Sequence, residues 1–225
     1  DRLHPEKKNR PIAAGILSKP TAHTAAVLLL GFSIIAAKWV DRELVQVITA
    51  YIILQLAYTF GLKRIALVDL FVIATGFVLR ALAGAVTLDV TISPWLLLCT
   101  LLLALFLALC KRRNEKVTQA ESTAETRPSL ADYDERLLDQ LIAIVSSACL
   151  VCYALYTLWP ETVAKFGTHQ LSFTIPFVIF GIFRYLDLVY RHEKGERPEQ
   201  ILLTDLPLLA DILLYGLTVL LILTR

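Results

Sequence analysis

Long apolar segments alternate with short polar links along the whole chain. Seven of these segments have about the 20 residues that a helix needs to cross a bilayer core of roughly 30 Å. They cover residues 22–40, 43–60, 66–88, 94–110, 137–158, 171–190 and 207–223. None of them alternates apolar and polar residues with a period of two, so helices are expected rather than a β-barrel. The pattern predicts an all-α polytopic membrane protein, with residues 1–225 forming one domain.

The links between these segments differ in length and in charge. The link at residues 111–136 is long and polar, and we expect it to carry a helix of its own. Sixteen of the 22 Lys and Arg residues lie in links on one side of the membrane, four lie on the other side, and Arg80 and Arg184 lie within spans. Cytoplasmic links carry an excess of positive charge, so the first residue is expected inside and the last outside. All three Trp residues then fall at the outer interface, where indole rings are enriched: Trp39, Trp95 and Trp159.

The composition excludes several classes of protein. Apolar residues make up 56% of the chain, charged residues make up 19%, and the formal net charge is +2. A disordered chain, a disulfide scaffold and a strongly basic nucleic-acid-binding protein are therefore not expected, and no nucleic acid is expected as a partner. The sequence contains no Met and begins with Asp1, so we expect further residues upstream in the natural protein.

The first polar cluster is the N-terminal segment 1–11, which joins an acidic residue to several basic ones. Its basic residues are typical of a cytoplasmic anchor before a span. Its His-Pro and Arg-Pro dipeptides also stiffen the loop and hold its side chains in place. A rigid basic loop beside a carboxylate suits a magnesium-bound phosphate, with the carboxylate on the metal and the cations on phosphate oxygens.

The second cluster comprises Tyr58, Lys63 and Arg64, followed by Asp69 and Arg80 inside the third span. Lys63 and Arg64 are typical of interfacial anchors. A charge inside the membrane costs about 2.5–3.5 kcal/mol on insertion scales, so Asp69 and Arg80 are expected to face a wet cavity or a partner. Their separation is close to three helical turns, which places both on one helix face. Arg80 also fits a purely structural role as a cap on a neighbouring helix end.

Two further clusters follow on the same side. Lys111-Arg-Arg-Asn-Glu115-Lys comes directly after an apolar run and is typical of a stop-transfer flank. Together with the first cluster it would form a strongly positive pocket, in which Glu115 pairs with Lys111 or reaches a metal or a sugar hydroxyl. In the fourth cluster, Arg184 and Asp187 at the end of the sixth span are spaced to neutralise each other or to contact substrate.

The segment DRLHPEKKNRPIAAG, residues 1–15, resembles the second half of the first conserved motif of the UbiA-type membrane prenyltransferase superfamily. That motif reads roughly N-D-x-x-D-x-x-x-D-x-x-H-P-x-K-x-x-R-P-I, and Asp1 corresponds to its last aspartate. The superfamily has nine transmembrane helices, with this motif between the second and the third. The resemblance therefore implies two further helices upstream. It also implies little or no activity of residues 1–225 without the earlier aspartates.

Aromatic prenyltransferases of this superfamily carry a second acidic motif, of DxxxD type, where this chain has Lys111-Arg-Arg-Asn-Glu115. That departure resembles the branch that transfers a phosphoribosyl group to decaprenyl phosphate, as do residues 58–84, 105–115, 127–133 and 183–205. The resemblance implies a bacterial inner (plasma) membrane enzyme with a cytoplasmic active site. It would transfer 5-phosphoribosyl from phosphoribosyl diphosphate to a polyprenyl phosphate, release pyrophosphate and require Mg²⁺. The product would be a precursor of cell-wall arabinan.

The resemblance also implies roles for individual residues, carried over by position. The catalytic set is Asp1, which is also the metal ligand, with Lys111 and Glu115. The substrate-binding set is Lys7, Arg10, Tyr58, Lys63, Arg64, Arg80 and Arg112. Lys7 and Arg10 would hold the diphosphate, and Lys111 with Arg112 would bind a phosphate of the donor or of the lipid. Glu115 would contact ribose or metal.

Two other functions stay open at this point. An aromatic polyprenyltransferase of the 4-hydroxybenzoate type would fit the superfamily, but it predicts acidic residues where Lys111 to Glu115 stand. A transporter or lipid-binding scaffold would use the charges inside the spans as a solute path. Against that reading, the charges crowd at one face of the membrane, and no inverted repeat is visible.

Overall fold

The computed structural model describes residues 11–120, 130, 132–191 and 198–224, and within them seven helices are long and apolar enough to cross a membrane. They are α1 (Lys19–Val40), α2 (Arg42–Phe60), α3 (Val68–Thr87), α4 (Pro94–Ala120), α5 (Glu135–Leu158), the continuous run Gln170–Arg191 made of η4 (Gln170–Thr174) and α7 (Ile175–Arg191), and α9 (Leu206–Leu223). No strand occurs in the described ranges. The predicted all-α class and the seven predicted spans are therefore confirmed.

The polar link after the fourth span differs from the prediction. The apolar run does not end its helix, because α4 continues through Lys111-Arg-Arg-Asn-Glu115 as far as Ala120. The separate helix expected in residues 111–136 is therefore wrong for residues 111–120, which are the last turns of α4. The physical reason is that Arg, Lys and Glu are good helix formers and that charged side chains of this segment pair with neighbouring helices. Four short elements were also not predicted: η2 (Leu62–Arg64), α6 (Pro160–Phe166), η4 (Gln170–Thr174) and α8 (Pro198–Thr204).

Single capping residues make some of the turns between spans very short. Asp41 alone separates α1 from α2, and its carboxylate accepts a hydrogen bond from the Glu43 backbone N–H at 2.5 Å. Ser18 caps α1, and Asp205 caps α9 by accepting from the Leu208 N–H at 3.0 Å. Side-chain oxygens at this position satisfy N–H groups that the first helical turn leaves without partners.

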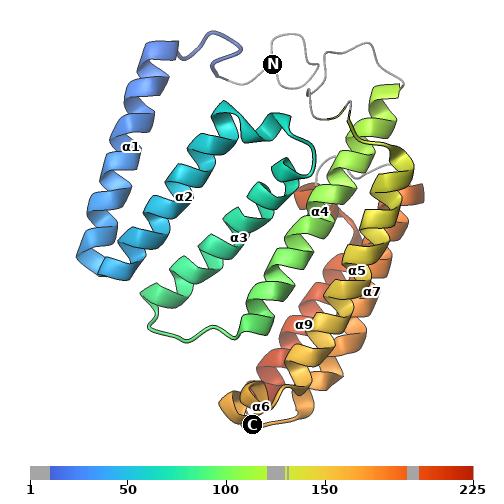
Figure 1. The fold of residues 1–225 in the computed structure, drawn as a ribbon. Helices are drawn as coiled ribbons and strands as arrows, with labels where there is room; N and C mark the ends of the chain where they lie inside the picture. Colours follow the sequence, from blue (N-terminus) through green and yellow to red (C-terminus); the bar gives the residue numbers. More distant parts are fainter. Residues whose placement is uncertain (1–10, 121–129, 131, 192–197, 225) are drawn as a thin grey trace.

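The spans alternate in direction, so the links of each kind gather at one end of the bundle (Figure 1). The start of α1, the turn between α2 and α3, the last turns of α4 and the start of α5 lie at one end. The α1–α2 and α3–α4 connections and α6 lie at the other end. The described basic residues of these links, among them Lys63, Arg64 and Lys111, therefore share one end of the fold, as the charge count predicted.

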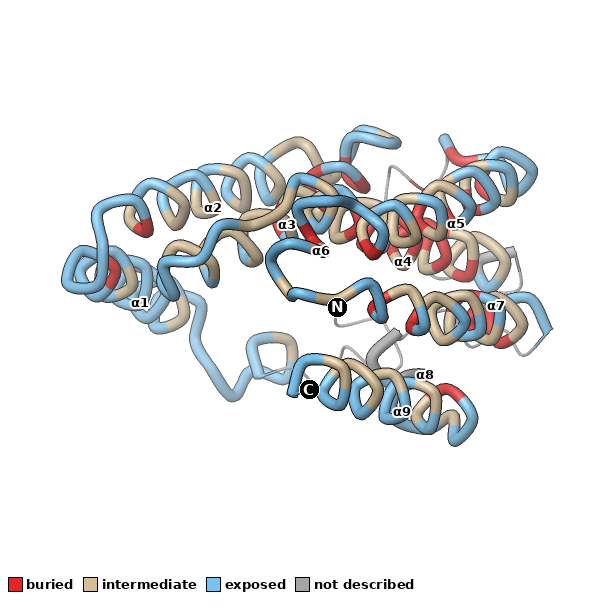
Figure 2. Tube along the Cα trace, turned by 90° about the horizontal axis from the view of Figure 1, so that it is seen from below, coloured by how far each residue is buried: buried red, intermediate tan, exposed pale blue. Residues whose placement is uncertain are grey.

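The spans follow one another in an open arc, seen end-on in Figure 2, and pack mainly against their neighbours in the chain. Buried side chains concentrate on α3, α4, α5 and α7, with Phe106, Leu138, Ile142 and Val189 almost fully enclosed. Helices α1 and α9, at the two ends of the arc, contain almost no buried residues, and the same is true of α2. In a bilayer, apolar side chains on such helices face lipid without cost, so the firm core lies in the middle of the arc.

Candidate functional site

A buried ion pair joins α3 to α4 at the basic end of the bundle. Asp69 lies in the first turn of α3 and is 0% exposed, and Arg112 lies in the last part of α4 and is 2% exposed. The Arg112 Nε donates a hydrogen bond to the Asp69 Oδ2 at 2.9 Å. A carboxylate in the first turn of a helix also gains from the positive end of the helix dipole. Each charge is tolerated in this buried place because the other is within contact distance.

Tyr133 extends this pair to the turn that precedes α3. Its hydroxyl donates to the Asp69 Oδ1 at 2.7 Å and accepts from the Leu67 backbone N–H at 2.7 Å. Burial, together with the hydrogen bond to Asp69, raises the pKa of Tyr133 above its usual range. The phenol therefore stays protonated and acts as a lasting donor to the carboxylate.

The backbone at Leu67 is strained. Its φ is 65° and its ψ is −46°, and the Val68 N–H donates to the Ala66 carbonyl at 2.8 Å, which closes a γ-turn centred on Leu67. This form of γ-turn is rare for a residue with a side chain, and such backbone conformations cost on the order of 1–3 kcal/mol. The turn persists because surrounding contacts, including the Tyr133 hydroxyl, hold it.

The cations after the apolar run of α4 divide into paired and unpaired ones. The Arg112 Nη1 donates to the Glu115 Oε2 at 2.6 Å, so Glu115 pairs with Arg112 and not with Lys111, the partner that the sequence suggested. The Arg113 Nε contacts Asp139 at 2.7 Å, and its guanidinium lies 4.0 Å from the centroid of the Tyr190 ring. Lys111 is partly exposed, and within the described ranges it makes no hydrogen bond or ion pair.

The predicted residues of the second cluster lie on and beside the turn between α2 and α3. Lys63 and Arg64 form part of η2, and among the described residues neither has an acidic partner. Tyr58 is half-buried near the end of α2. The contacts from Arg112 and Tyr133 to Asp69 and Leu67 place this turn beside the last turns of α4 and the start of α5. The structure therefore brings Lys63, Arg64 and the Lys111 segment to one end of the fold.

Arg80 does not join this group. It lies eleven residues beyond Asp69 on α3, which is about 16 Å along the helix axis. Its Nη2 donates to the Tyr51 hydroxyl of α2 at 2.5 Å, and its guanidinium lies over the rings of Tyr51 and Phe77. These contacts are to the middle of α2 and not to a helix end, so Arg80 does not act as the helix cap that the sequence allowed.

The fourth predicted cluster joins α7 to the start of α9. The Arg184 Nη1 contacts the Asp187 Oδ2 at 3.0 Å, which confirms the predicted self-neutralising pair. Arg184 also donates to both carboxylate oxygens of Asp205, at 2.8 and 3.1 Å, and Asp205 caps α9. This arrangement gives Arg184 a structural role between the two helices.

Three predicted residues lie outside the described ranges: Asp1, Lys7 and Arg10. Within those ranges, no three His, Cys, Asp or Glu side chains come together to hold a metal ion. Glu115, the predicted acidic residue that is described, is held by Arg112. The described part of the chain therefore provides no complete metal site of its own.

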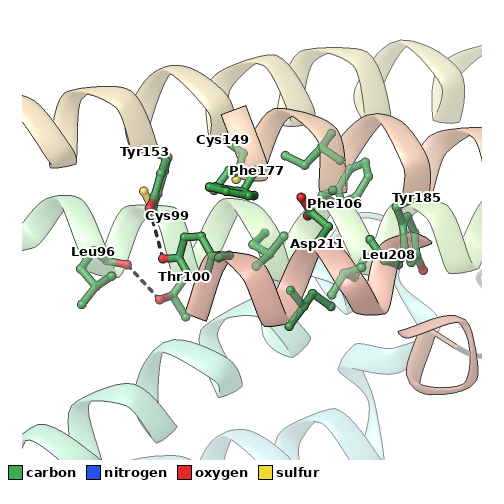
Figure 3. Close-up of a pocket in the computed structure, with 17 residues that line it drawn as sticks. Leu96, Cys99, Thr100, Phe106, Cys149, Tyr153, Phe177, Tyr185, Leu208 and Asp211 are labelled. Atoms are coloured by element: carbon green, nitrogen blue, oxygen red, sulfur yellow. Dashed lines mark hydrogen bonds between the residues drawn. The ribbon is translucent and has the colours of Figure 1, made fainter. Parts of the chain in front are cut away.

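An apolar cavity of about 400 Å³ lies between α4, α5, α7 and α9 (Figure 3). Its lining includes Cys99, Phe106 and Phe177, and one carboxylate, that of Asp211, faces the same space. Towards the end that carries α6, the Tyr153 hydroxyl lies 3.1 Å from the hydroxyl of Tyr215. The volume and apolar lining are typical of a site for a small or chain-like apolar ligand.

Sequence reasoning missed the contacts of Tyr133 and the position of Asp211 at the apolar cavity. Asp211 carried a signal, because it is the only charged residue in the apolar run of α9. Tyr133 carried none that periodicity reveals, because its partners Leu67 and Asp69 lie more than sixty positions earlier in the chain.

The chain belongs to the UbiA prenyltransferase family, whose sequence profile matches residues 1–203. It is 35% identical over 216 residues to a decaprenyl-phosphate phosphoribosyltransferase of Mycolicibacterium smegmatis, covering 91% of this chain and 66% of that protein. Proteins of the same name from Mycobacterium tuberculosis and Corynebacterium glutamicum are 37% and 36% identical, also over 91% of this chain, and are covered over 67% and 62% of their lengths. The chain thus spans about two thirds of the length of these relatives.

The fold is also similar to that of a solved structure, described as a UbiA homologue from Archaeoglobus fulgidus bound to Cd²⁺. The TM-score is 0.67, and the similarity covers 96% of this chain and 77% of that one, at 14% sequence identity. At this identity the similarity establishes the fold, and it agrees with the family assignment.

The buried pair yields a prediction about stability. Replacing Arg112 with Ala leaves the Asp69 carboxylate buried without its cation, so we expect the free energy of unfolding to fall by about 3–5 kcal/mol. Arg113→Ala is the matched control, because its partner Asp139 has a side chain that is 43% exposed, and we expect a loss of about 1 kcal/mol. Denaturant unfolding in detergent micelles measures both. Equal losses in the two variants would contradict the dominant role of the buried pair.

Proposed function

We propose that this protein transfers a 5-phosphoribosyl group from phosphoribosyl diphosphate to a polyprenyl phosphate and releases pyrophosphate. The similarity to decaprenyl-phosphate phosphoribosyltransferases over 91% of the chain supports this reaction. The structural observation that carries it is the sorting of cations at the basic end. Arg112 and Arg113 are satisfied by carboxylates, while Lys63, Arg64 and Lys111 have no acidic partner among the described residues. Cations left in this state are suited to anionic substrates.

The chemistry explains why a group of cations is needed. The phosphate oxygen of the lipid forms a bond to the anomeric carbon of ribose, while the bond from that carbon to the diphosphate breaks. The pyrophosphate leaves with the bonding electron pair. Both substrates are anions, so they repel each other unless fixed positive groups hold them together, and the leaving pyrophosphate gains further charge as the bond breaks.

The cations of the described ranges are assigned by their positions in the structure, and Lys7 and Arg10, which lie outside those ranges, by the resemblance alone. Lys63 and Arg64 lie on the turn before α3, and with Lys7 and Arg10 they would bind the diphosphate of the donor. Lys111 would bind the phosphate of the lipid or of the donor. Arg112 is occupied by two carboxylates, which favours a role in holding Glu115 in place over direct phosphate contact. Glu115, held through one carboxylate oxygen, would present the other to a ribose hydroxyl.

Mg²⁺ is proposed as the counter-ion of the donor diphosphate, held through Asp1 and the motif to which Asp1 belongs, where it would neutralise negative charge on the leaving group. The described residues offer no complete metal site, so the roles given to Lys63, Arg64 and Lys111 rest on their own charges.

The reaction is tested with membranes that contain the protein together with any sequence preceding residue 1 in its gene. Incubation with labelled phosphoribosyl diphosphate and decaprenyl phosphate is expected to give a labelled lipid. Lys111→Ala should reduce its formation by at least a hundredfold, since a cation at the reacting phosphate is lost. Lys38→Ala, a change of the same kind at the opposite end of the bundle, should leave the rate unchanged. Absence of labelled lipid with the wild-type protein would overturn the proposed function.

We further propose that the basic end of the bundle faces the cytoplasm, as the distribution of Lys and Arg predicts. Cysteines placed at exposed positions test this orientation. Glu161→Cys, on α6 at the far end, should react with a membrane-impermeant maleimide on intact cells. Arg64→Cys should react only after the membrane is opened, and the wild-type protein gives the background of the native cysteines. The opposite labelling pattern would reverse the proposed orientation.

The apolar cavity is proposed to hold part of the polyprenyl chain of the acceptor. Cys99→Phe adds a ring to the cavity wall, so it should raise the KM for decaprenyl phosphate several-fold and leave the KM for the donor unchanged. Cys152→Phe is the control, because Cys152 lies one helical turn from the lining residue Cys149 but does not line the cavity. Steady-state kinetics in detergent measure both constants. An equal KM for the lipid in the two variants would rule out this use of the cavity.

A further inference from the structure

The γ-turn at Leu67 directly follows the residues proposed to bind the donor. Lys63 and Arg64 belong to η2, whose hydrogen bonds run from the Arg64 N–H to the Gly61 carbonyl and from the Ile65 N–H to the Leu62 carbonyl. The Asp69 N–H then donates to the Ile65 carbonyl at 3.1 Å. The backbone from Gly61 to Asp69 is therefore one continuous hydrogen-bonded segment. The positions of Lys63 and Arg64 relative to α3 depend on the conformation of the turn in this segment.

A single phenol ties this segment to the rest of the site. The Tyr133 hydroxyl accepts from the Leu67 N–H inside the strained turn and donates to Asp69 at the start of α3. Tyr133 is 2% exposed and comes from the segment before α5. Relaxation of the turn to an ordinary backbone conformation would break the first of these hydrogen bonds, so the phenol opposes that relaxation.

The Asp69 carboxylate also connects the turn to α4. Asp69 uses one oxygen for Tyr133 and the other for Arg112, and Arg112 in turn holds Glu115. The hydrogen bonds thus run without interruption from the turn before α3 to the residues around Lys111. Two sets of cations that lie more than forty positions apart in the chain are thereby fixed relative to each other.

We infer that Tyr133 and Asp69 are positioning residues, which hold the turn of Lys63 and Arg64 at a fixed place relative to Lys111 so that the donor diphosphate is bound in the reactive orientation. This inference rests on the proposed function. Neither residue touches substrate in this role, and both act through the backbone at Leu67 and the side chain of Arg112. Small displacements of groups that hold a reacting substrate lower reaction rates strongly. Loss of the Tyr133 or Asp69 contacts should therefore lower kcat/KM for the donor more than it lowers the stability of the fold.

A pair of phenylalanine substitutions tests the inference. Tyr133→Phe removes only the hydroxyl, and Tyr190→Phe is the matched control, because Tyr190 also donates to an aspartate, Asp139, that is paired with an arginine of the same segment. Tyr190 is not linked to the turn by these contacts. We expect Tyr133→Phe to lower kcat/KM for phosphoribosyl diphosphate by about tenfold or more while the KM for decaprenyl phosphate changes less than twofold. Tyr190→Phe should change neither constant more than twofold.

A second measurement does not depend on catalysis. Hydrogen–deuterium exchange of the peptide around residues 61–69 should become faster in Tyr133→Phe and stay as in the wild type in Tyr190→Phe. Leu67→Gly removes the side chain that is strained at positive φ, so it should partly restore donor kcat/KM when combined with Tyr133→Phe. In an enzyme that forms labelled lipid, unchanged exchange, or donor kinetics equal in the two Phe variants, would overturn the positioning role alone. A wild-type protein that forms no labelled lipid would overturn the proposed function itself, and the exchange data would still report on the turn.

Discussion

The contact between Asp69 and Arg112 constrains the whole basic end of the structure. Both side chains are buried, and an isolated charge in such a place is costly, so α3 and α4 must pack in the one register that brings the two groups together. Arg112 also lies beyond the apolar run of α4, and the helix continues past it as far as Ala120. The turn before α3, the phenol of Tyr133 and the carboxylate of Glu115 all take their positions from this contact.

At this end of the bundle, carboxylates of the described ranges pair with Arg112 and Arg113 but not with the adjacent Lys111. Arg112 and Arg113 present several N–H groups in a planar fork, which lets each contact a carboxylate and a second group at once. Lys111 has a single ammonium group, and no carboxylate in the described ranges approaches it. A sequence of three adjacent cations is thus divided into two that hold helices together and one that remains for an anion. In the same way, Arg184 is paired with carboxylates and joins α7 to α9, whereas Lys63 and Arg64 have no acidic partner in the described ranges.

The membrane explains why a site of this kind is built at one end of an otherwise apolar bundle. Charges are tolerated where the helix ends meet water, and the interior offers apolar space between α4, α5, α7 and α9. The proposed transfer from a water-soluble phosphorylated sugar to a lipid phosphate would need both environments close together. The exposed outer faces of α1 and α9 are compatible with lipid, so the arc needs a firm core only around α3 to α7.

The sequence alone determined the helical class, the seven spans, their alternating direction and the family, because hydrophobic length and ordered motifs are local properties of the chain. It also pointed to Lys63, Arg64 and Lys111 as cations on one side of the membrane. Only the tertiary structure decided which groups pair: Glu115 with Arg112, and Asp69 with Arg112 and the neutral phenol of Tyr133. Asp69, Arg112 and Tyr133 come from separate segments of the chain, so their contacts depend on packing register and burial, which no local pattern encodes. Arg112 and Glu115 share α4, where spacing alone allowed Glu115 to pair with Lys111 as well.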